Sequence, residues 1–156
     1  MNITIKRTRL PILVLALALV LSACSRPPGP GKIGDRLEYK GYAMTVTNVE
    51  TANAFPGARR ASAGLTLIAV EILIESNGAN VQISPAHMWV AEPSGKVHKP
   101  HITGRAPILQ EQANVSKGQR VQGWLTFSVP EGATNLRFVN ELPKEFNHAE
   151  LKVNVN

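Results

Sequence analysis

Apolar and polar side chains alternate with a period of two along most of the chain from residue 33 onward. The alternation is clearest over residues 65–76, where one face carries Thr66, Ile68, Val70, Ile72 and Ile74. Successive side chains of a strand point to opposite faces of its sheet, and β-branched residues suit a buried pleated surface. The pattern therefore predicts a strand over residues 65–76 whose β-branched face lies in the core.

Shorter segments with the same alternation predict the other strands. Turn residues separate them, notably Lys40-Gly41, Asn77-Gly78 and residues 92–96. The expected strands cover residues 35–39, a hairpin partner from Tyr42, 81–91 interrupted by Pro85, 119–130, 136–139 and 151–155. Residues 52–63 and 99–118 are expected to be mostly irregular, and no segment has a helical stripe longer than about ten residues. The prediction is an all-β, immunoglobulin-like antiparallel β-sandwich over residues 33–156.

The first 23 residues follow a different pattern. Lys6, Arg7 and Arg9 precede an apolar run, Leu10–Ala23, which leads into Cys24. This order is typical of an export signal, and Leu-Ser-Ala-Cys resembles the lipobox of bacterial lipoproteins, whose cysteine is acylated before cleavage. We expect a lipoprotein signal peptide over residues 1–23 and lipidation of Cys24. An uncleaved anchor is disfavoured because the run of about 14 residues is shorter than the ~20 that a spanning helix needs. A plain secreted product is the other alternative.

Residues 24–32 are predicted to connect the lipid to the folded domain. Ser-Arg-Pro-Pro-Gly-Pro-Gly-Lys is rich in residues that disfavour helix and sheet, which indicates a stiff, partly extended tether. As in lipoproteins generally, the absence of Asp after the cysteine favours the periplasmic side of the outer membrane in a cell with two membranes. In a cell with one membrane, we expect the protein on the outer leaflet.

Composition narrows the chemistry. Without the signal peptide, 14 basic residues face 11 acidic ones, and a formal charge of +3 does not indicate a nucleic-acid partner. Cys24 is the only cysteine, so lipidation would leave no thiol for a disulfide or a metal. Asp35 is the only aspartate, which disfavours a calcium site built from several carboxylates. No cofactor is predicted.

Three stretches carry a resemblance to a known family. They are Gly41–Val46 with Asn48-Val49, Ala69–Gly78, and Lys117-Gly118-Gln119 leading to Gly123–Pro130. In these the sequence resembles the immunoglobulin-like domains of unknown function found in bacterial lipoproteins and secreted proteins, which are related to a small secreted mycobacterial antigen. The resemblance implies a β-sandwich over almost the whole domain. It implies no catalytic residues, because none are agreed for such domains.

Basic and aromatic side chains are the candidates for partner binding. Positive charge is concentrated at Lys96, Lys99 and Arg105, in a predicted hairpin and the loop after it, and at Arg59-Arg60 in a second loop. If both loops project from one end of the sandwich, they would suit an anionic polymer or lipid. Trp124 points away from the core face of its strand, so either the long loop over residues 99–118 covers it or it is an apolar anchor for a partner such as an envelope protein. The candidates are Trp124, Trp89, Lys96, Lys99, Arg105, Arg59 and Arg60.

Catalytic and metal sites have weaker support. His98 and His101 have metal-ligand spacing, but residues three apart in a strand lie on opposite faces, so a loop conformation would be needed. Glu71 and Glu75 would lie about 13 Å apart on one strand, beyond the separation that paired catalytic carboxylates use. The sequence therefore predicts a non-catalytic binding or interaction module of the cell envelope, anchored by lipid. The alternative is a metal or small-ligand carrier that uses the loop histidines, including His87 beside Met88.

Overall fold

The computed structural model describes residues 26–57, 60–78, 80–110 and 113–156. The predicted signal peptide, the lipidation site Cys24 and Arg59 lie outside the described residues. Among the described residues, no helix has the length and apolar character needed to cross a membrane.

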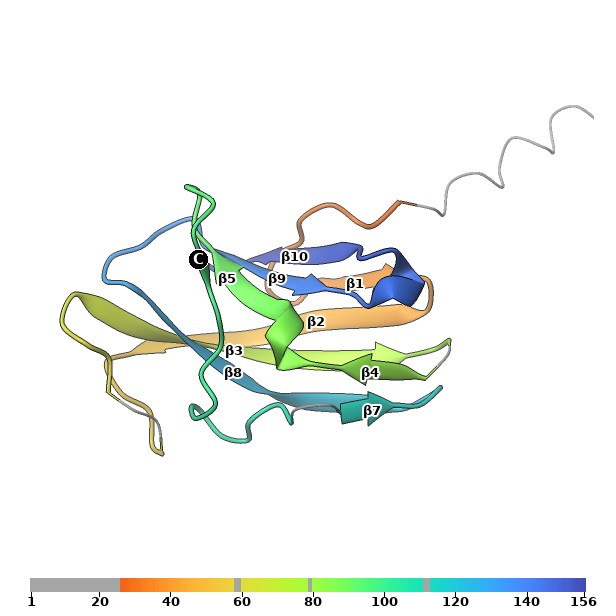
Figure 1. The fold of residues 1–156 in the computed structure, drawn as a ribbon, viewed down its shortest axis with the longest axis horizontal. Coiled ribbons are helices and arrows are strands. Elements are labelled where there is room, and N and C mark those ends of the chain that lie inside the picture. The colour runs from red at the N-terminus through yellow and green to blue at the C-terminus, as the bar shows by residue number, and fades with distance from the viewer. Residues whose placement is uncertain (1–25, 58–59, 79, 111–112) are drawn as a thin grey trace, which may run out of the picture.

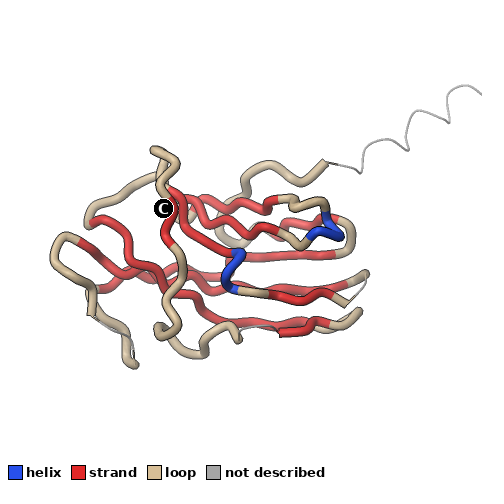
Figure 2. Tube along the Cα trace, in the orientation of Figure 1, coloured by secondary structure: helices blue, strands red, loops and turns tan. Residues whose placement is uncertain are grey.

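Two four-stranded antiparallel sheets pack against each other (Figures 1 and 2). The first has the order β1-β2-β3-β8, formed by Arg36–Tyr39, Tyr42–Ala52, Leu65–Ser76 and Arg120–Pro130. The second has the order β10-β9-β5-β6, formed by Glu150–Asn154, Arg137–Glu141, Met88–Ala91 and Val97–His98. A small third sheet pairs β4 (Val81–Ile83) with β7 (Ala113–Val115), and two 3-10 turns follow β4 and β9, η1 (Pro85–His87) and η2 (Lys144–Phe146). The predicted all-β, immunoglobulin-like sandwich is confirmed.

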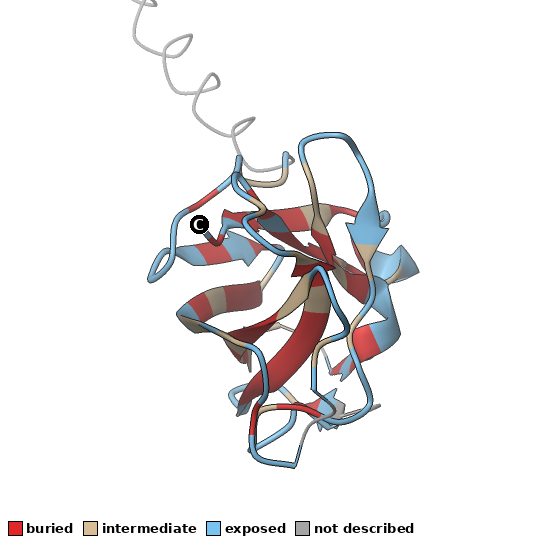
Figure 3. Ribbon diagram, turned by 90° about the vertical axis from the view of Figure 1, so that its left-hand side faces the viewer, coloured by how far each residue is buried: buried red, intermediate tan, exposed pale blue. Residues whose placement is uncertain are grey.

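The core lies between the two large sheets (Figure 3). The inward face of β3 carries Ile68, Val70, Ile72 and Ile74, each at most 2% exposed. They belong to one apolar cluster with residues of β9 and β10 such as Phe138 and Leu151. Burial of each such side chain contributes about 1.5–3 kcal/mol, so the predicted alternation of β3 stabilises the packing of the two sheets.

A second, smaller apolar cluster lies on the outer face of the first sheet. Phe55, Leu67, Ala69 and Trp124 form it, with Ala52 and Ala61 packed against it. Trp124 is only 5% exposed, because Phe55 and Ala61 come from the segment after β2 and cover it. Trp124 is therefore covered and is not an exposed anchor. The predicted cover, the loop over residues 99–118, contributes Arg105 over the ring, and the segment after β2 adds a cover that was not predicted.

The segment from 99 to 118 is more ordered than its sequence predicts. Residues 101–109, which we call the strap, run along the outer edge of β8: His101 N–H donates to Thr126 O at 2.8 Å, Leu109 N–H to Trp124 O at 3.0 Å and Trp124 N–H to Pro107 O at 2.8 Å. Ile108 pairs with Trp124 in parallel, and β7 follows. The strap comes so close because Gly123 has no side chain; a Cβ there would lie 2.6 Å from Leu109 backbone atoms.

The edge of β10 is covered by the end of the predicted tether. Gly31 N–H donates to Lys152 O at 2.8 Å, and Asn154 N–H donates to Gly31 O at 2.9 Å. Gly31 forms a parallel bridge with Val153. The chain is thus attached to the second sheet from Gly31 onward.

Candidate functional site

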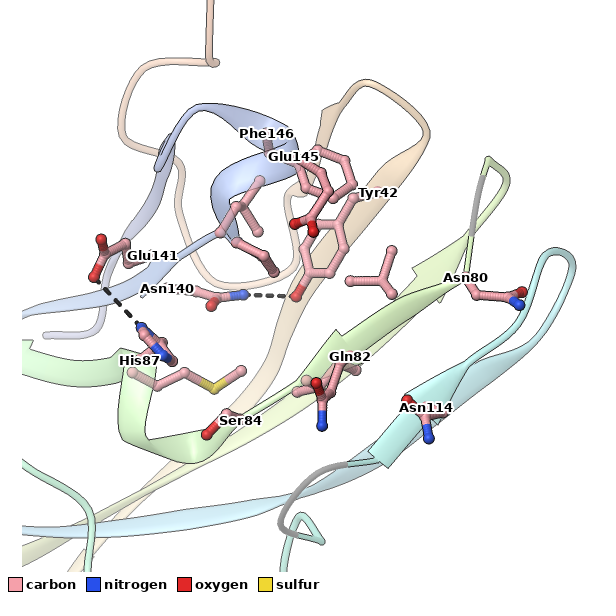
Figure 4. A pocket seen from close by; sticks show the side chains of 15 residues that line it. Tyr42, Asn80, Gln82, Ser84, His87, Asn114, Asn140, Glu141, Glu145 and Phe146 are labelled. Atoms are coloured by element: carbon pink, nitrogen blue, oxygen red, sulfur yellow. Dashed lines mark hydrogen bonds and ion pairs between the residues drawn. The ribbon is translucent and has the colours of Figure 1, made fainter.

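A cleft opens between the second sheet and the β4–β7 pair, at the end of the sandwich where η2 lies (Figure 4). Its volume is about 380 Å³. Apolar side chains from both sides form its floor, namely Ile83, Met88, Leu142 and Phe146. Polar side chains surround them, among them Asn80, Gln82, Asn114, His87, Glu141 and Glu145. This combination of an apolar floor and a few polar groups is typical of small-ligand sites.

A buried polar pair closes the inner end of the cleft (Figure 4). Asn140 Nδ2 donates a hydrogen bond to Tyr42 Oη at 2.6 Å and lies 3.6 Å from Met44 Sδ. The Tyr42 ring meets the Phe146 ring edge to face, with 6.0 Å between centroids. Burial raises the pKa of the Tyr42 phenol well above its ordinary value of 10.0. The inner wall is therefore neutral and polar.

Two carboxylates, Glu141 and Glu145, and the His87 imidazole line the outer rim, and His148 contacts Glu141 from outside the lining. Glu141 Oε1 lies 3.1 Å from His148 Nδ1, and Glu141 Oε2 lies 3.6 Å from His87 Nδ1. Glu145, on η2, adds a second carboxylate, and no ion pair joins it to any of the residues that the structure describes. The rim thus disfavours an anionic ligand.

The cleft also brings together Ser84, His87 and Glu141, the residue types of a hydrolase triad. The imidazole of His87 is 60% exposed, and its 3.6 Å separation from Glu141 exceeds hydrogen-bond length. Among the described residues, no hydrogen bond joins the Ser84 hydroxyl to His87; only the backbone carbonyl of Ser84 accepts the His87 N–H, at 3.0 Å. Among the described residues, these three side chains are therefore not joined by the hydrogen bonds that link the members of a catalytic triad.

The basic candidates from the sequence lie outside this cleft and contact neighbouring side chains. Arg105 Nε donates to Glu50 Oε2 at 2.9 Å, and its guanidinium lies 5.2 Å from the Trp124 ring centroid. Lys99 Nζ donates to Ala86 O at 2.9 Å and lies 4.5 Å from the Trp89 centroid. These contacts hold the side chains against the domain.

Lys96 and His98 share one carboxylate partner, whereas His101 contacts a hydroxyl. Lys96 Nζ lies 4.0 Å from Glu92 Oε1, and His98 Nε2 lies 2.6 Å from the same oxygen, a hydrogen bond that lowers the pKa of Glu92. His101 Nε2 lies 2.8 Å from Ser128 Oγ. Within the part of the chain that the structure describes, no group of three or more His, Cys, Asp or Glu side chains could hold a metal ion. The metal-carrier alternative gains no support from this geometry.

Sequence reasoning missed the cleft because its walls are far apart in the chain. Tyr42, Gln82 and Asn140 come from β2, β4 and β9. One signal was present: Asn140 directly follows the apolar pair Phe138-Val139 and precedes Leu142 at a predicted strand end. A buried amide needs a hydrogen-bond partner, so such a position points to a polar contact inside the fold.

Two packed antiparallel sheets and an open end cleft define an immunoglobulin-like β-sandwich with a candidate small-ligand site. No family model matches the sequence, and no curated protein matches it. The fold is similar to that of three solved proteins. The yjhA protein of Bacillus subtilis has a TM-score of 0.62 and 13% identity, over 81% of this chain and 99% of that one.

The second similar structure is ycdA of Bacillus subtilis, described as a putative lipoprotein, with a TM-score of 0.61 and 12% identity over 77% of this chain. The alignment covers 38% of ycdA. The third is MPT63, a secreted protein of Mycobacterium tuberculosis, with a TM-score of 0.57 and 13% identity, over 81% of this chain and 95% of that one. These likenesses confirm the predicted resemblance at the level of the fold.

Proposed function

We propose that this protein is a non-catalytic, extracytoplasmic binding module, held to its membrane by lipid on Cys24, whose ligand enters the cleft between the second sheet and β4–β7. The observation that carries the proposal is the cleft itself, about 380 Å³ with an apolar floor and a hydrogen-bonding rim. The export signal and lipobox pattern support the location. So do the descriptions of ycdA and MPT63, which share the fold.

The side chains of the cleft define the kind of ligand. Ile83, Met88 and Phe146 offer contact to an apolar body, and Asn114 with Gln82 offers amide donors and acceptors to a hydrogen-bonding edge. Glu145 would repel a carboxylate or phosphate. We therefore expect a neutral ligand such as a peptide segment with an aliphatic side chain.

Two probes that differ in one group test this ligand class. N-acetyl-leucinamide is neutral, whereas N-acetyl-leucine carries a carboxylate at neutral pH. We expect the amide to bind the full chain in neutral detergent with a Kd of about 1 mM, and the acid to bind at least about threefold more weakly. Nuclear magnetic resonance titration would follow the backbone amides of Gln82, Asn114 and Asn140.

Two variants complete the test. Ser84→Trp fills the cleft and should abolish binding, and Glu145→Gln should reduce the preference for the amide. Arg137→Gln, on an exposed part of β9, is the control for global changes in charge. Equal binding of both probes by Ser84→Trp and wild type would contradict the assignment of the cleft.

The anchor and the absence of catalysis are tested separately. Labelled palmitate should enter the wild-type protein in cells and not Cys24→Ser; label in both would exclude Cys24 as the attachment site.

Hydrolysis of p-nitrophenyl acetate should be the same for wild type and Ser84→Ala. A rate that falls at least about tenfold in Ser84→Ala would instead identify Ser84 as a nucleophile.

A further inference from the structure

A depression on the outer face of the first sheet carries polar groups that the cleft does not use. It has a volume of about 210 Å³, and Leu67 of β3 contributes to its lining. Its polar lining consists of Arg60, Ser62, His101, Thr103, Thr126 and Ser128. The two loops whose basic residues were identified separately in the sequence therefore meet here, through Arg60 and His101.

The strand register and the strap place these groups. Thr126 and Ser128 alternate onto the same face of β8, and Ser128 pairs with Leu67 across the sheet. His101 is held by two contacts: its N–H donates to Thr126 O at 2.8 Å, and its Nε2 lies 2.8 Å from Ser128 Oγ. Gly104 allows the strap to lie against Thr126, because a Cβ at Gly104 would overlap the Thr126 side chain.

The lining is rich in hydrogen-bond donors. Four hydroxyls, a guanidinium and an imidazole line the depression, and no carboxylate is among the described residues that line it. The Ser128 hydroxyl and the His101 imidazole share one hydrogen bond, so together they offer one donor to a ligand. Thr126 Oγ1 already accepts the Arg105 N–H at 3.0 Å, so its own hydrogen is available as a donor. Thr126 is 2% exposed, which makes it a fixed part of the wall.

The charge of the depression is positive. Arg60 forms no ion pair with any residue that the structure describes. Arg60 also lines a second depression, whose lining includes the carboxylate of Glu131. Glu50 is bonded to Arg105. A ligand that only accepts hydrogen bonds and carries negative charge would satisfy this set of donors.

We propose that this depression binds the phosphoryl group of a phosphate ester. The oxygen atoms of a phosphoryl group are several hydrogen-bond acceptors in a small volume, and an arginine guanidinium can donate to two of them at once. The segment that carries Arg60 lies at the opposite end of the long axis from Arg26, where the described chain begins (Figure 1). The phosphoryl group is therefore carried by a soluble molecule or polymer, not by the bilayer to which the N-terminal end would be attached.

Titration of glycerol 3-phosphate into the full chain, held in phosphatidylcholine nanodiscs, tests the proposal. We expect saturable binding that Arg60→Gln weakens at least about tenfold, the loss of one charge-assisted contact. Arg60→Lys should lose less, because it keeps the charge. Ser128→Ala should weaken binding about threefold to tenfold, and Arg137→Gln, which removes a charge from β9, should leave it unchanged. Thermal midpoints would establish that each variant is folded.

The other arms distinguish the sources. Inorganic phosphate should bind with the same dependence on Arg60, which would identify the phosphoryl group as the recognised part. Nanodiscs that contain phosphatidylglycerol should not reduce glycerol phosphate binding; competition would assign the site to lipid headgroups and overturn the proposed source. Equal binding by Arg60→Gln and wild type, or equal weakening by Arg137→Gln, would overturn the site. The phosphoryl site depends on neither the end cleft nor lipidation, so it can fail independently of them. Only the choice of a soluble source over the bilayer depends on the lipid proposed on Cys24.

Discussion

At the scale of single residues, the hydrogen bond between Asn140 and Tyr42 joins the two sheets. Both side chains are buried, and each supplies the partner that the other needs. A buried polar atom left without a partner costs about 1–3 kcal/mol, whereas removal of both partners costs less. The pair therefore links stability to the wall of the cleft, because a change that disrupts it also alters the ligand site.

A double-mutant cycle tests this coupling. Tyr42→Phe and Asn140→Leu should each lower the free energy of unfolding by about 1–3 kcal/mol, because each leaves a buried group unsatisfied. The double variant should lose less than the sum of the two single losses. Urea denaturation of the full chain would measure the three values, and additive losses would show that the bond contributes no coupling energy.

Glu92 gives a prediction of pH dependence. The hydrogen bond from His98 holds its pKa below the ordinary value of 4.5. A carboxyl whose folded-state pKa is depressed stabilises the fold above its unfolded pKa, and this stabilisation is lost as the pH falls through the folded-state value. As the pH is lowered from 4.5, the urea concentration at the unfolding midpoint should therefore decrease more steeply for the wild type than for Glu92→Gln. Parallel curves for the two proteins would contradict this role.

At the scale of elements, β3 and the strap show what the sequence could and could not predict. Residues 65–76 were predicted with the observed bounds because their alternation is a local property of the chain. The sequence predicts an irregular segment over residues 99–118. It does not show the order of the strap, because the hydrogen bonds of the strap run to β8 and not within the segment. The strand β7 is too short to show a detectable alternation. The cleft and the Arg60 depression could not be predicted, because each is formed by segments that lie far apart in the sequence.

Gly123 provides a test of the strap. A Cβ at this position would lie 2.6 Å from backbone atoms of Leu109, so Gly123→Ala must displace the strap or β8. We expect the free energy of unfolding to fall by about 1–3 kcal/mol. Gly29→Ala is the matched control, because no atom lies within 4 Å of its added Cβ. Thermal or urea denaturation would compare them, and equal stability of the two variants would contradict the close approach.

At the scale of the whole molecule, the two candidate sites lie toward opposite ends of the sandwich (Figure 1). The cleft opens beside η2, β4 and β7, whereas the Arg60 depression lies under the segment after β2 and the strap. Gly31 connects the N-terminal part of the chain to β10. If Cys24 carries lipid, the seven residue steps from Cys24 to Gly31 span at most about 25 Å. The domain would therefore stay close to the membrane.

The attachment at Gly31 can be tested with a matched pair of variants. Gly31→Pro removes the N–H that donates to Lys152 O and adds a Cβ 2.9 Å from Leu37 Cδ2, so it should lower the free energy of unfolding by about 1–3 kcal/mol. Gly29→Pro should change it by no more than about 0.5 kcal/mol, because the position is exposed and its surroundings are open. Urea denaturation would measure both. Equal losses would show that the bridge to β10 contributes nothing specific.

The strap along β8 and Gly31 along β10 have a consequence for many copies crowded on one surface. Unpaired strand edges are templates on which neighbouring molecules can extend each other's sheets into aggregates. Here the long edge strand of the first sheet and one edge of the second are already occupied by the chain itself. On the opposite edges, β1 has four residues, including the charged Arg36 and Glu38, and β6 has two residues. Copies packed side by side would therefore meet little unpaired strand edge on the two large sheets of the described chain.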